Sequence, residues 1–281
     1  MKRKGILFLS LLLGAMFFIS ASGCSSSKEQ PMALDLYAFS MGQADCLLLS
    51  YDGYHILIDT AEDDDGEDIA QELEDLGVDT IDLLVLTHFD KDHIGGLPEL
   101  LEHVQVKACL RPDYVRDSKK YRAMEEALQK HGVPVQSLSA DTGLALGRGN
   151  FTFWVSPIPY DTKEKNDNEL SLVTRFTYGD CAYVFMGDAE QRWLDALCFK
   201  GYDLTCSVLK APHHGEWEDN ISALAPLSLP EYVLINDSKK NPADERTLSA
   251  FTLLGADTLC TADGTVHLTS DGKRVWSQED S

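Results

Sequence analysis

The chain has 281 residues, of which 46 are Asp or Glu and 24 are Lys or Arg, so its formal net charge is −22 at pH 7. A surface this acidic repels polyanions at long range, which argues against a basic groove for nucleic acid. With 44% hydrophobic residues, the composition is that of a folded globular protein.

The N-terminus has the pattern of an export signal. Three basic residues at positions 2–4 precede an apolar run over residues 6–19, and the small-residue segment Ala21-Ser22-Gly23 leads to Cys24. The apolar run is short for a membrane span. The segment before Cys24 resembles the lipobox of a bacterial lipoprotein, and an uncleaved anchor is the alternative.

We therefore predict a signal peptide over residues 1–23, lipidation of Cys24, and a polar tether over residues 24–32. The protein would be extracytoplasmic and held by its lipid anchor at the bacterial cytoplasmic membrane. Loss of residues 1–23 removes three basic residues and no acidic one, which moves the formal charge from −22 to −25.

Apolar runs and turn residues alternate along the remaining chain in an order typical of an α/β protein. This order predicts a four-layer αββα sandwich, in which helices flank two mixed β-sheets, within one domain over residues 33–281. We expect a monomer. The predicted helices cover residues 97–102, 119–130 and 243–254. The predicted strands cover residues 34–39, 46–49, 55–58, 81–86, 151–155, 172–177, 183–186, 205–209 and 232–235, with two more near Thr258 and Val266.

An acidic run over residues 62–68 follows the third predicted strand. We interpret it as a solvated loop leading into a helix, because carboxylates are favourable beside the N-terminal end of a helix dipole. A calcium-binding loop is the alternative.

Four side chains that can bind metal follow the predicted strand over residues 81–86 within a single turn. They are His88, Asp90, Asp92 and His93. A turn at a strand end can gather such groups around one or two cations without help from distant segments. A single residue of this kind is more often a solvated turn residue, but four at this spacing predict a metal site.

Two later strand ends carry further candidate ligands. The apolar run over residues 182–186 leads to Gly187 and Asp188, and the run over residues 208–211 leads to Pro212, His213 and His214. A carboxylate at such a position can bridge two metals, and packing alone does not account for three strand ends of this type.

These motifs resemble the metallo-β-lactamase superfamily, and more closely its branch that contains the hydrolase domain of ComEC-type DNA-uptake proteins. The resemblance covers roughly residues 33 to 270. It includes an opening segment that ends in Gly42-Gln43-Ala44-Asp45, the strand Ile56-Leu57-Ile58-Asp59, and the segment Asn168-Glu169-Leu170-Ser171-Leu172-Val173. Each piece alone is weak, whereas the ordered set is specific.

The chain departs from the common pattern of the superfamily at one ligand. Asp90 stands where most relatives have a second histidine, as it does in the ComEC-like branch. A carboxylate oxygen makes the first metal site harder and more tolerant of manganese. No histidine is evident between this motif and Asp188, because His103 and His131 are interpreted as structural. We therefore expect a weakly held first metal.

The resemblance implies a role for each candidate residue. His88 and Asp90 would bind the first metal, and Asp188 would bridge the two metals. Asp92, His93 and either His213 or His214 would bind the second metal. Asp59 would orient the site from behind. Asn168 and Ser171 would contact substrate, although a turn that caps a strand is an equal interpretation.

The implied cofactors are two divalent ions, zinc or manganese, and the implied activity is that of a metal-dependent hydrolase. A metal-bound hydroxide would attack a phosphodiester or another anionic ester. Asp92 would accept a proton while remaining a ligand, and the paired histidine that is not a ligand would assist the leaving group. An anionic substrate would be held by the metals and by local cations such as Lys91, Lys210 or Arg175. The alternatives are an inactive metal-dependent binding lipoprotein and a β-lactamase-type amide hydrolase.

Overall fold

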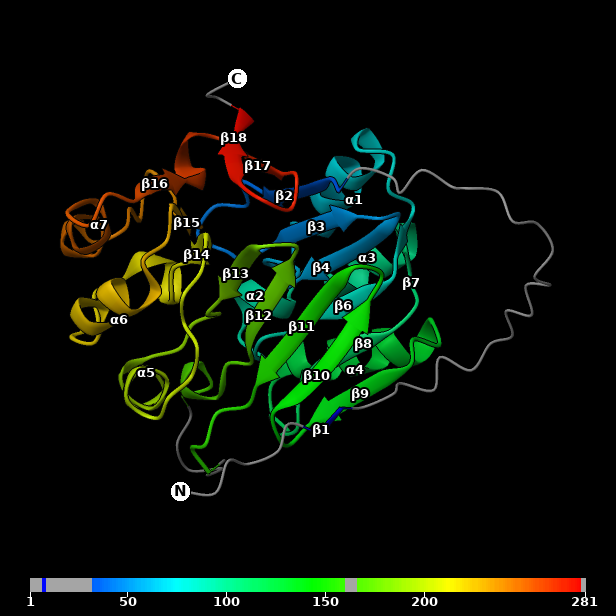
Figure 1. The fold of residues 1–281 in the computed structure, drawn as a ribbon. Helices are drawn as coiled ribbons and strands as arrows, with labels where there is room; N and C mark the ends of the chain where they lie inside the picture. The colour runs from blue at the N-terminus through cyan, green and yellow to red at the C-terminus, as the bar shows by residue number, and fades with distance from the viewer. Residues whose placement is uncertain (1–6, 9–31, 160–165, 279–281) are drawn as a thin grey trace.

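Two β-sheets of eight strands each lie face to face, with helices on both outer surfaces (Figure 1). The computed structural model describes residues 7–8, 32–159 and 166–278. Cys24, most of the tether and the predicted signal peptide apart from Leu7–Phe8 lie outside these residues. The predicted four-layer αββα sandwich is confirmed.

The first sheet contains the early strands of the chain together with its last two. In spatial order the strands are β18 (Val275–Ser277), β17 (Val266–Ser270), β2 (Leu34–Ala38), β3 (Leu47–Tyr51), β4 (Tyr54–Ile58), β6 (Leu83–Val85), β8 (Cys109–Pro112) and β9 (Val135–Leu138). Pairing is antiparallel from β18 to β4 and parallel from β4 to β9. A separate pair, β5 (Thr80–Ile81) and β7 (Gln105–Val106), is parallel.

Apart from β1 (Leu7–Phe8), which is blue in Figure 1, the second sheet is built by residues 142–260, which run from green to orange-red. In spatial order its strands are β1, β10 (Thr142–Leu146), β11 (Gly149–Trp154), β12 (Val173–Tyr178), β13 (Cys181–Phe185), β14 (Val208–Lys210), β15 (Tyr232–Ile235) and β16 (Asp257–Cys260). Strands β13 to β16 are parallel, so their carboxyl ends lie on one edge of the sheet.

Each sheet is covered on its outer face by its own set of helices. One set, α1 (Gly66–Asp75), α2 (Lys91–Ile94), α3 (Leu97–His103) and α4 (Lys119–Lys130), lies against the first sheet. The other, α5 (Gln191–Phe199), α6 (Ile221–Ser228) and α7 (Glu245–Thr252), lies against the second. Among the described residues, no helix has the length and apolar character needed to cross a bilayer.

Period-two alternation along the strands sorts the core into three clusters. In β6, Leu84 packs under the helices, whereas Leu83 and Val85 face the other sheet. Side chains such as Leu36 and Phe176 from opposite sheets meet in the central cluster. This packing fixes the two sheets relative to each other, so that the loops after their parallel strands meet at one edge.

Candidate metal centre

The loop after β6 presents four of the predicted ligands around the start of α2. His88 and His93 are buried, whereas Asp90 and Asp92 are partly exposed. The rings of His88 and His93 have centroids 4.0 Å apart. The predicted strand-end motif therefore does gather these side chains in space.

A close backbone contact after α2 explains the glycine in this motif. A Cβ added at Gly95 would lie 2.4 Å from the carbonyl oxygen of Lys91 and 2.5 Å from the backbone nitrogen of Asp63. Glycine alone lets these segments approach so closely, and this approach brings the acidic loop beside α2.

The second sheet contributes its ligands through strained backbone. Gly187, just before Asp188, has a φ of 53°, and His213 and His214 have φ values of 45° and 51°. Left-handed conformations cost non-glycine residues about 1–3 kcal/mol each. A Cβ at Gly215 would lie 2.8 Å from the Cβ of Ala243, so packing holds this turn in place.

Asp92, His93, Asp188 and His214 form a compact cluster. Nε2 of His93 and Nε2 of His214 each lie 3.2 Å from Oδ2 of Asp188. Nε2 of His214 is also 3.4 Å from Oδ2 of Asp92. One ligand atom from each of the four residues lies within 4.8 Å of the others.

The donor set of this cluster fits a divalent metal. Nε2 of His93 and Nε2 of His214 are buried and make no hydrogen bond in the structure. Buried polar atoms are ordinarily paired, so convergent unpaired nitrogens beside carboxylates point to a ligand. Imidazole together with carboxylate suits zinc or manganese.

Side chains behind the cluster fix the orientation of both rings. Nδ1 of His93 lies 2.8 Å from Oδ2 of Asp59, and Asp59 accepts hydrogen bonds from the backbone nitrogen and Oγ1 of Thr87 at 2.8 and 2.6 Å. Nδ1 of His214 lies 3.1 Å from the carbonyl oxygen of Asn236. Each ring therefore directs Nε2 towards the carboxylates.

A buried ion pair that the sequence analysis did not predict joins the two sheets behind these ligands. Asp45 precedes β3, Lys210 ends β14, and each is 1% exposed. Nζ of Lys210 pairs with the Asp45 carboxylate and lies 3.7 Å from Oδ1 of Asp188. The other oxygen of Asp45 lies 3.4 Å from Nδ1 of His214. Lys210 is thus enclosed, and the expectation that it contacts substrate is wrong.

The charges of the cluster hold protons on its histidines in the metal-free protein. Burial alone lowers the pKa of His93 and of His214, but Asp188 and other carboxylates raise both values well above the usual range. Burial would raise the pKa of Asp188, yet these histidines hold it well below the usual range. Metal binding at this cluster therefore requires the release of protons.

The part of the centre that contains His88 and Asp90 is more exposed to solvent than the four-residue cluster. Nε2 of His88 is buried without a hydrogen bond, and it lies 3.9 Å from Oδ2 of Asp90. Oδ1 of Asp90 lies 3.2 Å from Nη1 of Arg116, which also pairs with Asp167. Burial raises the pKa of Asp90 to about 6, with Arg116 opposing the shift.

His213 lies outside the four-residue cluster, although it adjoins it. Nε2 of His213 is 3.4 Å from Nδ2 of Asn168, and Nδ1 is 3.6 Å from Oε1 of Glu190. Asn168 also donates to Glu190 at 2.8 Å. Of the paired histidines, only His214 therefore joins the cluster.

Ser171 and Arg175 were expected to contact substrate, but the structure places neither of them at the cavity over the cluster. Ser171 is fully buried two residues before β12, and its Oγ accepts a hydrogen bond from the backbone nitrogen of Asp188 at 3.2 Å. It therefore supports a candidate ligand from behind. Arg175 pairs with Asp203 on the outer side of β12.

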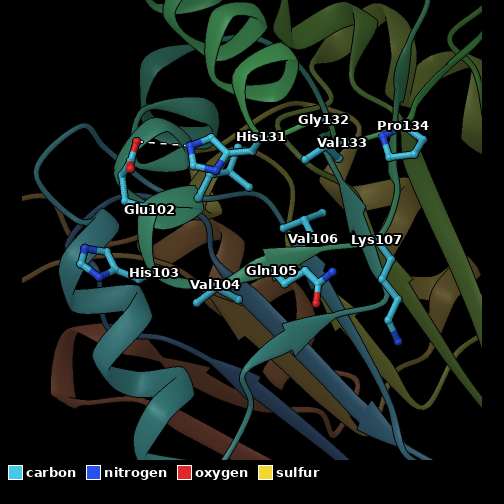
Figure 2. Close-up of a pocket in the computed structure, with 11 residues that line it drawn as sticks. Glu102, His103, Val104, Gln105, Val106, Lys107, His131, Gly132, Val133 and Pro134 are labelled. Carbon is cyan, nitrogen blue, oxygen red and sulfur yellow. Dashed lines mark hydrogen bonds and ion pairs between the residues drawn. The ribbon is translucent and has the colours of Figure 1, made fainter.

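A cavity of about 580 Å³ opens over the cluster and is lined by Asp92, His213 and His214, among others. Figure 2 shows a different cavity, of about 560 Å³, which lies between the ends of α3 and α4 and beside β7. There His131 pairs with Glu102 at 3.2 Å, and His103 pairs with Glu99 at 3.4 Å. Neither histidine belongs to the metal cluster.

The fold and the strand-end cluster are those of a metal-dependent hydrolase. The family model described as the Metallo-beta-lactamase superfamily matches residues 40–235, and the chain belongs to this superfamily. The resemblance drawn from the motifs is confirmed.

Two curated relatives are competence proteins. ComE operon protein 3 of Bacillus subtilis (strain 168) is 27% identical over 165 residues, which are 59% of this chain and 21% of that protein. Competence protein ComA of Neisseria gonorrhoeae is 26% identical over 204 residues, which are 71% of this chain and 26% of that protein. The chain thus matches about a fifth to a quarter of the length of these relatives.

A solved structure with the same fold is Zn(2+)-bound PqqB from Methylobacterium extorquens. It has a TM-score of 0.58 at 13% identity, over 84% of this chain and 99% of that one. At this identity the likeness shows the fold alone.

Proposed function

We propose that the protein is a lipid-anchored hydrolase that uses two divalent metals, zinc or manganese, to cleave a phosphodiester or another anionic ester. The observation that carries the proposal is the largely buried cluster of Asp92, His93, Asp188 and His214, in which Nε2 of both histidines makes no hydrogen bond, with a third such Nε2 on His88 beside Asp90. The similarity to competence proteins and the zinc bound by PqqB support it.

The residues divide between two sites that share one carboxylate. Asp92, His93 and His214 would hold one metal, and His88 and Asp90 would hold the other. Asp188 would serve both. When bound, the cations supply Lewis acidity, which lowers the pKa of water and neutralises charge on ester oxygens.

The remaining residues of the site orient groups and handle protons. Asp59, itself fixed by Thr87, keeps the Nδ1 proton of His93 directed away from the cluster. His213, beside the cavity and hydrogen-bonded to Asn168, can deliver a proton to a leaving group. In the hydrolysis, a water oxygen bonds to phosphorus and gives up a proton to Asp92, the ester P–O bond breaks, and the leaving oxygen takes a proton from His213.

Elemental analysis of the purified full-length chain, followed by hydrolysis of bis(p-nitrophenyl) phosphate, tests the proposal. We expect bound transition metal, loss of activity on chelation and its return with manganese or zinc. Protein that binds metal fully but cleaves no phosphodiester, monoester, carboxylic ester or lactam would instead be a binding lipoprotein. Protein that takes up no metal would contradict both assignments.

The anchor needs a separate experiment. Labelled fatty acid should enter the wild-type protein, and Cys24→Ser should release a soluble or unprocessed form. A membrane-bound Cys24→Ser variant, together with unlabelled wild type, would identify an uncleaved N-terminal anchor instead.

A further inference from the structure

Two cavities of opposite charge flank α2 at the metal centre. The cavity over the cluster, which we call the acidic cavity, has the carboxylates of Glu62, Asp64, Asp65 and Glu216 on its walls. On the other side of α2 lies a cavity of about 360 Å³, which we call the basic cavity. Its cations are Lys91, Arg116 and Lys120.

The two cavities meet at the candidate ligands. Lys91 and Asp92 line both, His214 lines the acidic cavity, and Asp90 lines the basic cavity. A phosphoryl group held between the two metal sites would therefore extend one arm into each cavity. The cluster of Asp92, His93, Asp188 and His214, which both cavities adjoin, marks where the phosphoryl group would sit.

We propose that the substrate is a short, asymmetric phosphodiester with a second anionic group on one arm, of the size of a phosphorylated dinucleotide. This proposal rests on the hydrolase function proposed above. The anionic arm occupies the basic cavity, and the other arm, neutral or cationic, occupies the acidic cavity. Long polynucleotides are poor substrates.

Charge sets the direction in which the substrate binds. Besides Asp92, the acidic cavity has four carboxylates against Lys91 and Lys240, whereas the carboxylates lining the basic cavity are the candidate ligands Asp90 and Asp92. Lys120 and Arg116 pair with Asp63 and Asp167, yet each retains N–H donors for a phosphate. In the acidic cavity Lys91 pairs with Glu62 at 2.6 Å, so a phosphate there would face an excess of carboxylates, those of Asp64, Asp65 and Glu216.

The volumes of the two cavities also favour a short substrate. Ligand pockets for small molecules measure roughly 300–1,000 Å³, and the two cavities are about 580 and 360 Å³. Each therefore holds one arm of a small molecule. A longer strand would carry further phosphates past Asp64 and Glu216, where like charges repel them.

Three probes test this assignment with the full-length, metal-loaded protein. They are thymidylyl-thymidine, its 5′-phosphorylated form and a long single-stranded oligothymidylate. The expected order of kcat/KM per diester is phosphorylated dinucleotide, then plain dinucleotide, then oligothymidylate. An oligothymidylate cleaved as fast as the phosphorylated dinucleotide would overturn the inference while leaving the hydrolase assignment intact. A protein inactive on all three probes and on bis(p-nitrophenyl) phosphate would contradict the proposed function itself.

Charge variants separate the two cavities. Because exposed charge contacts are each worth about 0.2–1 kcal/mol, Lys120→Ala should reduce the preference for the phosphorylated dinucleotide by roughly 1.4- to fivefold. Asp64→Lys combined with Glu216→Lys should raise the ratio of oligothymidylate to dinucleotide cleavage by about tenfold, with a smaller effect at high salt.

The matched control combines Asp257→Lys on β16 with Asp75→Lys at the end of α1, which changes two exposed acids outside both cavities. It should leave the substrate ratios unchanged. If this variant shifts the ratios as much as the cavity variants do, overall charge rather than the cavities governs selection, and the inference is wrong.

Discussion

Both halves of the metal centre place a carboxylate between histidine and a cation, but the two cations differ in how deeply they are buried. Asp188 turns one oxygen to two histidines and the other to Lys210, and Asp90 turns one oxygen to His88 and the other to Arg116. The side chain of Lys210 is 1% exposed, whereas that of Arg116 is 25% exposed. The same arrangement of carboxylate, histidine and cation is thus rigid on one side and solvated on the other, and we expect the solvated side to bind metal more weakly.

Removal of the shared carboxylate should have the largest effect. Asp188→Ala takes an oxygen from both sites, so we expect both metals to be lost and activity to fall by more than about 100-fold, beyond the 10–100-fold typical of groups behind ligands. Asp90→Ala should lose one metal only. Elemental analysis of the two variants makes the comparison, and equal metal loss would show that the halves are not distinct.

The next largest effects should come from the cations behind the two carboxylates, with Lys210 contributing more to stability than Arg116. Lys210→Met leaves Asp45 buried without its partner, which costs about 3–5 kcal/mol of unfolding free energy, and it should weaken metal binding by about 10–100-fold. Arg116→Met should cost about 1–3 kcal/mol, because solvent reaches Asp90, whereas its other partner Asp167 is buried. Denaturant unfolding and metal titration measure both quantities.

A double variant shows whether charge or packing causes the loss at Lys210. If the unpaired charge of Asp45 is responsible, adding Asp45→Asn to Lys210→Met should recover much of the lost stability. No recovery in the double variant would mean that Lys210 contributes through packing, and the comparison with Arg116 would fail.

The paired histidines allow a comparison within the buried half. His214→Ala should lower metal content, because Nε2 of His214 faces Asp92 and Asp188. His213→Ala should keep the metal and lower turnover by roughly 10²–10⁴-fold, as expected for loss of a general acid. Metal content measured alongside kcat distinguishes the two, and metal loss in the His213 variant would place both histidines among the ligands.

The smallest expected effect is a pH dependence in the metal-free protein. Burial raises the folded-state pKa of Asp90 to about 6, above the value of 3.8 for an unperturbed carboxyl. The folded state therefore holds this proton more tightly than the unfolded state, and its stabilising contribution is lost as pH rises from about 4 to 6. Thermal unfolding of the metal-free wild type should show this decline relative to Asp90→Asn. Parallel curves would rule it out.

The sequence predicted the part of the site whose residues lie close together in the chain. His88, Asp90, Asp92 and His93 follow one strand within one turn, so their proximity is readable from spacing alone. Asp45 and Lys210 lie on different sheets and meet only when the sandwich closes, which spacing cannot show. Asp45 did lie in the recognised opening motif, and that was the available signal for its role.

The same reasoning explains the elements that were missed. Strands β9 and β10 are short and partly exposed, so neither presents an apolar run. Helix α6 contains Pro226, which favours a turn over a helix in a sequence reading. The helix predicted over residues 243–254 is shorter, because the side chain of Asp244 caps its first turn and the helix ends at Thr252.

The ion pair between Asp45 and Lys210 also bears on when the centre forms during folding. The turn with His88 and His93 can form early, since its contacts are local, whereas contacts between distant segments form late because chain closure costs entropy. A chain whose sheets have not yet docked therefore has only a weak local set of ligands. Tight metal uptake would report completed folding, and a nascent chain would be protected from trapping the wrong ion before its sheets dock.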